Sequence, residues 1–549
     1  MSSLKVEIES CFHRKSERLI LREVKFETTP NQRIAFVGES GAGKTVLFNA
    51  VLGFLDPAEW EIMGSVRFND IELLQYGIKE WETIRGRQIR YLLQNPSLAV
   101  NPGFKVGYQL EEALEVASPG ISPTEVSGQI RSMLKRLRLD SGDHLMSRYP
   151  SQLSKGQLQR LGLALTLLAP CKLLFVDEPF NFLDSTVLID LLELLKESQA
   201  SGKIETLVMI SHDLNIASVM NCDQYYLLQE GRIIEKQESL HGKILFRSQY
   251  GKSLQEAATF LRTSSHAGKR KVNGIGERRS PPASDNAKQL LVVDGISSGY
   301  WGKGTLFPKR VMVIRNVSMD LKEGEFLGVI GNSGEGKSTL GLCIADIIEL
   351  FDGHIQFGDM RFEKGGHGED KKRLRNGIHY LVQDAASSFD PAQRILDNLM
   401  ECAKGSSLDL AKAQAQISRL SKYFLLEGEE VQKFPHQLSG GQKQRCAIIR
   451  SLLGPPKLLI ADEPFAHLDV FLQIRLIRLL DVLKKQKGCP MSCILISHDL
   501  GSVLGLCERI VFIHNGRLVG HFRTGAEWNI LNDTIKSFYE AARSIGYVC

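Results

Sequence analysis

Two stretches of the chain have the residue types and the spacing that bind phosphate groups. Gly38-Glu-Ser-Gly-Ala-Gly-Lys-Thr45 and Gly331-Asn-Ser-Gly-Glu-Gly-Lys-Ser338 both fit the P-loop pattern, and each follows a short apolar run. Glycines let the backbone wrap around phosphate oxygens, lysine supplies a cation, and the final hydroxyl can reach Mg²⁺. Two such loops predict two nucleotide sites. Their phosphate-binding residues are predicted to be Gly38, Ser40, Gly41, Gly43, Lys44 and Thr45 in the first, and Gly331, Ser333, Gly334, Gly336, Lys337 and Ser338 in the second.

A carboxylate pair closes an apolar run further along in each half: Asp177-Glu178 and Asp462-Glu463. Alone, such a pair could equally be a helix N-cap. Behind a phosphate-binding loop it has a chemical use, because the aspartate suits a Mg²⁺ shell and the glutamate can polarise a water toward the γ-phosphate. We therefore predict Asp177 and Asp462 as metal ligands, with the hydroxyls of Thr45 and Ser338, and Glu178 and Glu463 as catalytic residues.

These elements repeat in the same order, so the chain reads as two copies of one domain. Short apolar runs end at glycines or acids, and helical stretches separate them, which predicts a buried parallel sheet of the α/β class in each copy. The expected strands are Arg33–Val37, Lys172–Val176 and Thr206–Ile210, then Phe326–Ile330, Lys457–Ala461 and Ser492–Ile496.

Domain boundaries follow from a stretch rich in Ser, Gly, Lys, Arg and Pro that lacks apolar periodicity. We expect a first domain over 1–262, a flexible linker over 263–288 and a second domain over 289–549. The basic residues of the linker could touch RNA or anionic lipid, but a solvated tether explains them more simply.

Composition narrows the class of protein. The chain has 549 residues, 43% of them hydrophobic, and a formal net charge of +5, which is too weak to argue for nucleic-acid binding. No apolar run is long enough to span a bilayer, and the N-terminus has no apolar signal region. The ten cysteines are scattered, and the close pair Cys489 and Cys493 has no second pair or histidine at ligand spacing, so we predict no cysteine metal site.

A further loop ahead of each carboxylate pair carries a family resemblance. Leu153-Ser-Lys-Gly-Gln157 and Leu438-Ser-Gly-Gly-Gln442 each place their serine 23 residues before the aspartate. With the P-loops, this resembles ABC-type ATPases over nearly the whole chain. The resemblance implies duplicated P-loop NTPase domains of the ABC type, each with a mixed sheet and a helical subdomain, that hydrolyse ATP with Mg²⁺.

The resemblance also implies roles for residues outside the P-loops. Gln94 and Gln383, after apolar strands, would join the metal shell, and His212 and His498, each in Ser-His-Asp, would contact the γ-phosphate. A single histidine after a strand is more often a core residue. The aromatic side chains of Phe12 and Tyr300, upstream of the P-loops, could stack on adenine or belong to the core, and the sequence leaves both open.

In this family the signature loop of one domain covers the nucleotide of the other. The implied composite sites place Lys44 and Glu178 opposite Ser439, Gly440 and Gly441, and place Lys337 and Glu463 opposite Ser154. Lys155 departs from the pattern, because it stands where the second half has Gly440. A lysine brings a cation toward phosphate but also bulk and a restricted φ, so we expect two unequal sites.

The surroundings of Gln94 and Gln383 resemble the peptide and nickel importer branch: Gln94-Asn-Pro-Ser-Leu-Ala-Val-Asn-Pro102 and Gln383-Asp-Ala-Ala-Ser-Ser-Phe-Asp-Pro391. Gln249-Tyr250 and the helix-like stretch to Phe260 resemble the tail of that branch, without its cysteine cluster. The resemblance implies an ATPase peripheral to the cytoplasmic face of the inner membrane, driving oligopeptide, dipeptide or nickel import. Its implied partners are two permease subunits and an external substrate-binding protein.

Two alternatives stay open at this point. One is a soluble twin ATPase acting on ribosomes or nucleic acid, although the linker, broken by Gly274, Gly276, Pro281 and Pro282, does not suit the long helical arm of such proteins. The other is a regulatory protein without catalysis, which both complete sets of Lys, Asp, Glu and His disfavour.

Overall fold

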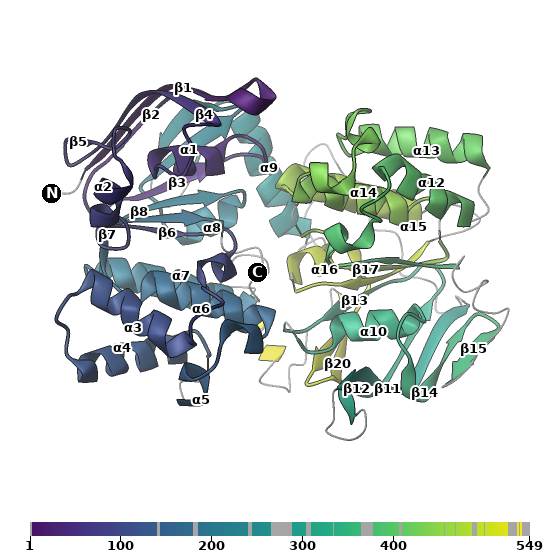
Figure 1. The fold of residues 1–549 in the computed structure, drawn as a ribbon. Coiled ribbons are helices and arrows are strands. Elements are labelled where there is room, and N and C mark those ends of the chain that lie inside the picture. The colour runs from purple at the N-terminus through teal and green to yellow at the C-terminus, as the bar shows by residue number, and fades with distance from the viewer. Residues whose placement is uncertain are drawn as a thin grey trace. The chain divides into compact units, whose positions relative to one another are not determined.

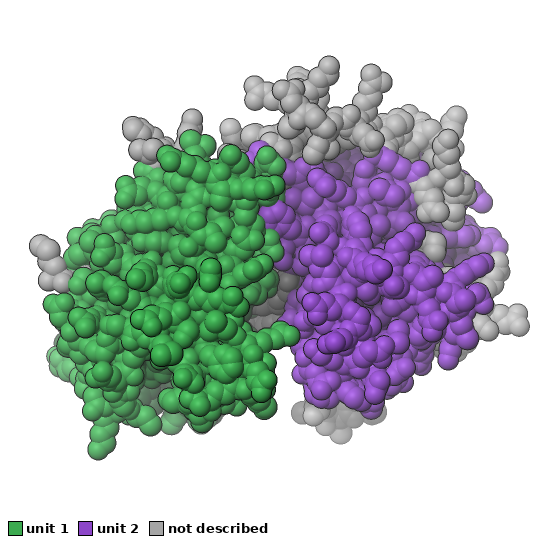
Figure 2. All heavy atoms as spheres, turned by 90° about the horizontal axis from the view of Figure 1, so that it is seen from above, with its two compact units in different colours: residues 1–258 green, residues 259–549 purple. Residues whose placement is uncertain are grey.

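The computed structural model describes residues 3–139, 143–178, 185–239, 244–264, 288–302, 309–332, 334–363, 377–405, 409–454, 456–466, 468–485, 491–498, 500–524, 535–536 and 539–540. Apart from residues 263, 264 and 288, the expected linker lies outside these ranges. The chain divides into two compact units, 1–258 and 259–549, coloured separately in Figure 2. Each is treated by itself below.

Unit 1 contains a mixed six-stranded sheet that carries the expected strands. Its order is β10-β9-β3-β8-β7-β6, and all its neighbouring pairs are parallel except β9 with β10. The strands are β3 (Arg33–Val37), β6 (Ile89–Leu92), β7 (Cys171–Asp177), β8 (Ile204–Ser211), β9 (Gln224–Gln229) and β10 (Arg232–Glu238). Nearly every residue of β7 and β8 is buried, which explains their continuous apolar sequence.

A second, antiparallel sheet of unit 1 has the order β2-β1-β4-β5. Its strands are β1 (Leu4–His13), β2 (Arg18–Thr28), β4 (Trp60–Phe68) and β5 (Ile71–Glu72). One apolar core joins the inner faces of both sheets and includes Phe36, Phe48 and Phe175. Phe48 lies on α1, so burying this helix fixes the end of the first P-loop against the sheet.

The helices of unit 1 are α1 (Lys44–Val51), α2 (Ile78–Ile84), α3 (Val106–Ala117), α4 (Pro123–Arg136), α5 (Asp143–Met146), α6 (Lys155–Leu167), α7 (Ser185–Ala200), α8 (Leu214–Val219) and α9 (Gln249–Ser264). In Figure 1, α3, α4 and α6 group on one side of the six-stranded sheet and form a helical subdomain. The expected tail therefore forms α9.

Unit 2 repeats this architecture. Its mixed sheet has the order β16-β17-β18-β13-β19-β20, and its antiparallel sheet the order β12-β11-β14-β15. The strands are β11 (Gln289–Gly302), β12 (Lys309–Lys322), β13 (Phe326–Ile330), β14 (Leu350–Phe357), β15 (Met360–Glu363), β16 (Ile378–Leu381), β17 (Leu458–Asp462), β18 (Ser492–Ile496), β19 (Arg509–His514) and β20 (Arg517–Arg523). The helices are α10 (Lys337–Ile344), α12 (Ile395–Gly405), α13 (Leu410–Tyr423), α14 (Gly440–Ser451), α15 (Val470–Lys484) and α16 (Leu500–Leu506). The predicted duplicated α/β fold with mixed sheets is confirmed.

Candidate nucleotide sites

The P-loop of each unit connects a central strand to a helix and needs glycine at defined points. A Cβ added to Gly38 would lie 2.3 Å from the carbonyl oxygen of Leu228, so no side chain fits there. Gly43 has φ 96°, a left-handed conformation that glycine adopts without strain. Gly331 and Gly336 repeat these features, with the same 2.3 Å approach to a carbonyl and the same φ. Both loops therefore have the backbone form that their sequence predicts.

The P-loop lysines are buried against their own loops. Lys44 Nζ donates to the carbonyl oxygens of Gly38 at 2.9 Å and Glu39 at 2.8 Å. Lys337 makes the corresponding pair of bonds, both 2.8 Å long, in unit 2. A phosphate would offer a charged acceptor stronger than these neutral carbonyls. Each ammonium is thus held at the loop and can turn toward a nucleotide.

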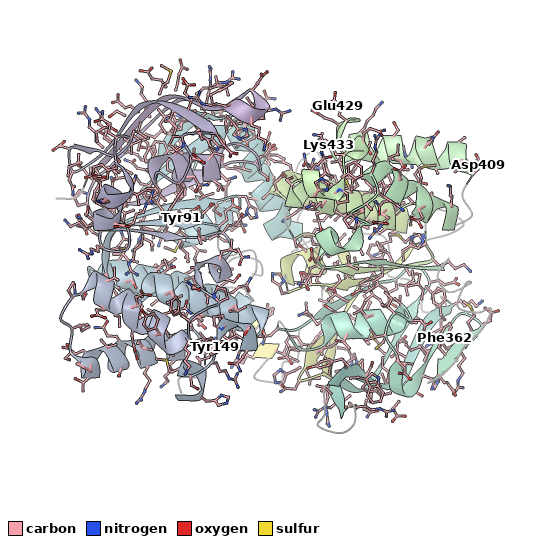
Figure 3. The ribbon with its side chains drawn as sticks, in the orientation of Figure 1. Tyr91, Tyr149, Phe362, Asp409, Glu429 and Lys433 are labelled. Carbon is pink, nitrogen blue, oxygen red and sulfur yellow. The ribbon has the colours of Figure 1, made fainter. Side chains whose placement is uncertain are left out.

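The aspartate at the end of β7 meets the P-loop through a hydroxyl. Thr45 Oγ1 donates to Asp177 Oδ1 at 3.2 Å, and Tyr91 Oη donates to Asp177 Oδ2 at 2.8 Å. Tyr91 lies on the neighbouring strand β6 and is labelled in Figure 3. Burial raises the pKa of Asp177 to about 6, and the charge of Glu178 adds to that increase while the Tyr91 hydroxyl opposes it. At neutral pH this carboxyl is an ionised group in a buried setting.

Unit 2 has the same arrangement around Asp462. Tyr380 Oη donates to Asp462 Oδ2 at 2.9 Å, and burial raises the pKa of Asp462. Its other oxygen, Oδ1, is buried and has no hydrogen-bond partner in the described part of the chain. A buried carboxylate oxygen without a donor is suited to a cation, and Mg²⁺ prefers oxygen ligands. The residues of the second site therefore fit a magnesium ion, and the carboxylate and hydroxyl oxygens of Asp177 and Thr45 provide the same kind of ligand in the first.

The catalytic candidates Glu178 and Glu463 pair with the histidines. His212 Nδ1 lies 3.0 Å from Glu178 Oε2, and Lys44 Nζ lies 3.5 Å from Glu178 Oε1. In unit 2, His498 Nδ1 lies 2.8 Å from Glu463 Oε1. Burial alone would raise the pKa of Glu178, but His212 and Lys44 hold it below its ordinary value. Each glutamate is thus held by a contact with its histidine.

Both glutamates have an unusual backbone. Their φ angles are 43° at Glu178 and 49° at Glu463, in the left-handed region that non-glycine residues seldom adopt. Such strain persists only where the surroundings enforce it, and it clusters at functional sites. Its recurrence at equivalent positions of both units indicates a geometric requirement on the carboxylate rather than a loop irregularity.

Gln94 and Gln383 are exposed just beyond β6 and β16. Because β6 pairs in parallel with β7, Gln94 and Asp177 lie at the same edge of the sheet. The parallel pairing of β16 with β17 places Gln383 and Asp462 together in the same way. This edge is where open α/β sheets bind ligands. The placement is compatible with the predicted metal shell, although no bond of either glutamine to the aspartates is present in the described residues.

The signature serines begin helices. Ser154 and Ser439 accept a hydrogen bond from the backbone N–H of Gln157 and Gln442, respectively, both at 3.3 Å, and so cap α6 and α14. These bonds lie within their own loops, so the hydrogen bonds do not join the serines to the P-loop of the same unit. Ser333 of the second P-loop lies outside the described residues.

The position of Lys155 does not need glycine for its backbone. Its counterpart Gly440 has no left-handed φ, and a Cβ added there would meet no atom within 4 Å. A residue with a Cβ is therefore compatible with the backbone of this position within its own unit. What distinguishes the two signature loops is the charged side chain itself.

The pairing of the strands shows which residue of unit 1 is equivalent to Tyr300 of unit 2. Leu21 and Ile314 are equivalent, because each lies where a Cβ added to the last glycine of its P-loop would meet it. Leu21 pairs with Cys11, and Ile314 pairs with Ser298, so Cys11 and Ser298 are equivalent too. One residue further on, Phe12 therefore corresponds to Gly299.

Tyr300 lies two residues after Ser298, and His13 lies two residues after Cys11, so Tyr300 corresponds to His13 rather than to Phe12. The ring of His13 lies 4.5 Å from that of Trp60, while Tyr300 is 59% exposed. The residue at the position of Tyr300 in unit 1 is thus an imidazole next to an indole.

Sequence reasoning missed the two phenols that hold the aspartates. A signal was present: Tyr91 and Tyr380 each stand three residues before a predicted metal-shell glutamine, so both copies share them. It also missed His13, because only the strand pairing reveals its counterpart.

The fold and these sites define a class of protein, and comparison with known proteins agrees. The family model described as ABC transporter matches residues 21–181 and 314–466, and the chain belongs to this family. It therefore carries two ATP-binding cassettes and is an ATPase of that family.

Among its relatives, the chain is 30% identical over 517 residues to the uncharacterized ABC transporter ATP-binding protein YejF of Escherichia coli strain K12, covering 92% of both chains. It is 29% identical over 534 residues to the glutathione import ATP-binding protein GsiA of Salmonella typhimurium, covering 92% of this chain and 84% of the relative. A solved structure titled RNase-L Inhibitor shares the fold, with a TM-score of 0.60, 19% identity and coverage of 97% and 93% of the two chains. Among the described residues, no helix has the length and apolar character needed to cross a bilayer.

Proposed function

We propose that this chain is the ATP-hydrolysing component of an importer for peptides. The observation that supports this most is the similarity, over 92% of the chain, to ATP-binding proteins of transporters, one of them named for glutathione import. The chain would work at the cytoplasmic face of the inner membrane with two permease subunits and an external substrate-binding protein. Oligopeptides, dipeptides and glutathione are the proposed cargo class, with nickel as the alternative.

The proposed catalytic arrangement has a first domain over 1–262 and a second over 289–549, joined by a linker over 263–288. Nucleotide bound to Lys44 would be covered by the loop that begins at Ser439, and nucleotide bound to Lys337 by the loop that begins at Ser154. Two ATP molecules would then hold the domains together, and their hydrolysis would release them.

Within each site, the residues have separate tasks. Asp177 and Thr45, with Gln94, would hold Mg²⁺; in the second site Asp462, Ser338 and Gln383 would do so. The ion, when bound, neutralises charge on the phosphate oxygens.

The glutamates and histidines act on the other side of the phosphate chain. Glu178 and Glu463 accept hydrogen bonds from the attacking water, and His212 and His498 orient the glutamates and contact the γ-phosphate. The contacts of Glu178 with His212 and of Glu463 with His498 fix the direction of both carboxylates.

Genetic deletion followed by uptake measurement tests the function. Cells lacking this chain are expected to lose uptake of labelled peptides, and the chain with Glu178→Gln and Glu463→Gln together should fail to restore it although it folds. Loss of nickel uptake alone would instead assign the alternative cargo. Unchanged uptake of peptides, glutathione and nickel, together with co-sedimentation of the chain with ribosomes, would refute import and support the soluble twin ATPase.

Unequal sites are a further part of the proposal. Lys155 distinguishes one composite site from the other, so Glu178→Gln and Glu463→Gln, each made separately, should reduce steady-state ATPase activity to different extents. Equal residual activities in the two variants would remove the asymmetry.

A further inference from the structure

The hydroxyl of Tyr250 touches the P-loop of unit 1. Tyr250 is the second residue of α9, and its hydroxyl oxygen accepts a hydrogen bond from the backbone N–H of Glu39 at 2.9 Å. Glu39 is the first residue after the strand-end glycine of the loop. A helix that follows the cassette core therefore reaches back to the nucleotide loop.

Independent contacts fix the start of α9, so the hydroxyl is not presented by chance. The carboxylate of Glu235 on β10 accepts the backbone N–H groups of Arg247 at 2.6 Å and Ser248 at 3.0 Å. The side-chain amide of Gln255 accepts a hydrogen bond from the N–H of Phe246 at 3.1 Å and donates one to the carbonyl oxygen of Ile244. These bonds involve residues before and after Tyr250 in the sequence, so they fix the start of α9 and with it the position of Tyr250.

The peptide groups of Glu39 are held from two directions. Its carbonyl oxygen accepts from Lys44 Nζ at 2.8 Å, while its N–H donates to Tyr250. Nucleotide binding draws the lysine ammonium away from the carbonyl toward phosphate, because phosphate is the stronger acceptor. The bond to Tyr250 does not involve the lysine, so the movement of Lys44 need not break it.

We propose that Tyr250 is a positioning residue for the nucleotide site of unit 1. It keeps the start of the P-loop in its phosphate-binding form while Lys44 exchanges the loop carbonyls for phosphate. This inference rests on the nucleotide binding assigned to unit 1 and adds a residue outside the phosphate-binding pattern to that site.

The second unit holds its loop differently. Lys252-Ser-Leu-Gln-Glu-Ala-Ala258 recurs as Lys536-Ser-Phe-Tyr-Glu-Ala-Ala542, which aligns Thr534 with Tyr250 and removes the phenol. Thr534 lies outside the described residues. In the P-loop of unit 2, the carboxylate of Glu335 instead contacts His514 Nδ1 at 3.0 Å and the backbone N–H of Asn515.

Glu335 has no counterpart in the first loop, where Ala42 occupies its position. The contribution of Tyr250 is thus specific to one of the two sites.

The test separates the sites by disabling one P-loop at a time in the full chain. Tyr250→Phe is made in a Lys337→Ala chain, in which only the first loop is intact, and in a Lys44→Ala chain, in which only the second is. ATP binding is measured by calorimetry. We expect a dissociation constant about 3- to 10-fold higher in the first background, the range that one neutral hydrogen bond spans, and a change below about 2-fold in the second.

A matched control removes a hydroxyl elsewhere in the same unit. Tyr225→Phe deletes a buried hydroxyl that donates to the carbonyl oxygen of Ala217 at 3.1 Å, and it should leave ATP affinity unchanged. In the chain with both lysines, Tyr250→Phe should raise KM for ATP and leave kcat within about 2-fold. If Tyr250 had a purely structural role, the substitution would lower the unfolding temperature without this difference between KM and kcat.

The outcomes distinguish this inference from the function on which it rests. No change in either background, or an equal change in both, would overturn the role of Tyr250. Failure of the Lys337→Ala parent to bind ATP, with tyrosine still at position 250, would refute nucleotide binding by unit 1 and the positioning role with it.

Discussion

Removing the Tyr91 hydroxyl tests whether Asp177 is a buried anion that a residue of the neighbouring strand β6 stabilises. Tyr91→Phe keeps the ring and deletes a 2.8 Å bond to Asp177, whose side chain is 1% exposed. Among the described residues, Thr45 is the hydroxyl donor that remains to this carboxylate, at 3.2 Å. Because the Tyr91 hydroxyl lowers the pKa of Asp177, its removal raises that pKa further, and the comparison is made at pH 8 to favour the ionised form.

The expected loss follows from the charge of the acceptor. Hydrogen bonds to charged groups contribute about 1.5–3 kcal/mol, against about 0.5–1.5 kcal/mol for neutral pairs. For a domain of this size, about 1 kcal/mol shifts the unfolding temperature by about 2–4 °C. Tyr91→Phe should therefore lower the unfolding temperature of unit 1 by about 3 to 12 °C in the absence of nucleotide.

Scanning calorimetry with a chelator present, so that no divalent ion replaces the lost donor, measures this shift. Tyr226→Phe is the matched control, because its hydroxyl donates to the neutral side-chain oxygen of Gln224 at 3.0 Å. Tyr380→Phe should repeat the larger loss in unit 2. If Tyr91→Phe and Tyr226→Phe shift the transition equally, Asp177 does not carry a charge that the phenol stabilises, and the reasoning fails.

Three further predictions concern the surroundings of the sites. In a chain with a disabled second P-loop, His13→Ala should weaken ATP binding about 3- to 10-fold, as loss of a ring stack does, while Phe12→Ala should not; a titration showing the reverse order would assign base stacking to Phe12. Burial raises the pKa of Glu235, but hydrogen bonds from the segment entering α9 outweigh it and lower that pKa to about 2. Its stabilisation of the segment is therefore complete above the ordinary pKa of 4.5 and is lost as the pH falls toward 2. Glu235→Gln should speed amide exchange of residues 247–248 several-fold at pH 7 by mass spectrometry, and unchanged exchange would contradict this anchoring. Gly440→Ala should leave unit 2 as stable or raise its stability by up to about 1 kcal/mol in a denaturant titration, since alanine is the better helix former; a clear loss would show that the backbone needs glycine there.

The sheet and the chemical groups on its edge were predictable because they depend on local signals. Arg33–Val37, Phe326–Ile330 and Ser492–Ile496 form strands with the expected ends, since each is a continuous apolar run buried on both faces. The duplication identified the candidate residues in both halves, and hydrogen bonds join two pairs of them, Thr45 with Asp177 and His212 with Glu178, which the sequence alone did not predict.

The contacts that sequence did not reveal depend on register and on distant segments. The equivalence of His13 with Tyr300 follows from the pairing of Cys11 with Leu21 and of Ser298 with Ile314, and no residue type marks this register. The bond from Glu39 to Tyr250 joins residues 211 apart, which local propensity cannot anticipate. The sequence pattern located the candidate catalytic residues, but the packing around them depends on contacts between distant segments.

The two cassettes share their catalytic geometry and differ in what surrounds it. Glu178 and Glu463 have the same strained backbone and each contacts its histidine, so the proposed catalytic glutamates are placed alike. Other differences lie at Tyr250, at His13 and at Lys155, which we propose to act on the nucleotide or its loop. Because the proposed general bases share their backbone conformation and their histidine contact, inequality between the sites should appear in ATP affinity before it appears in the rate of the chemical step.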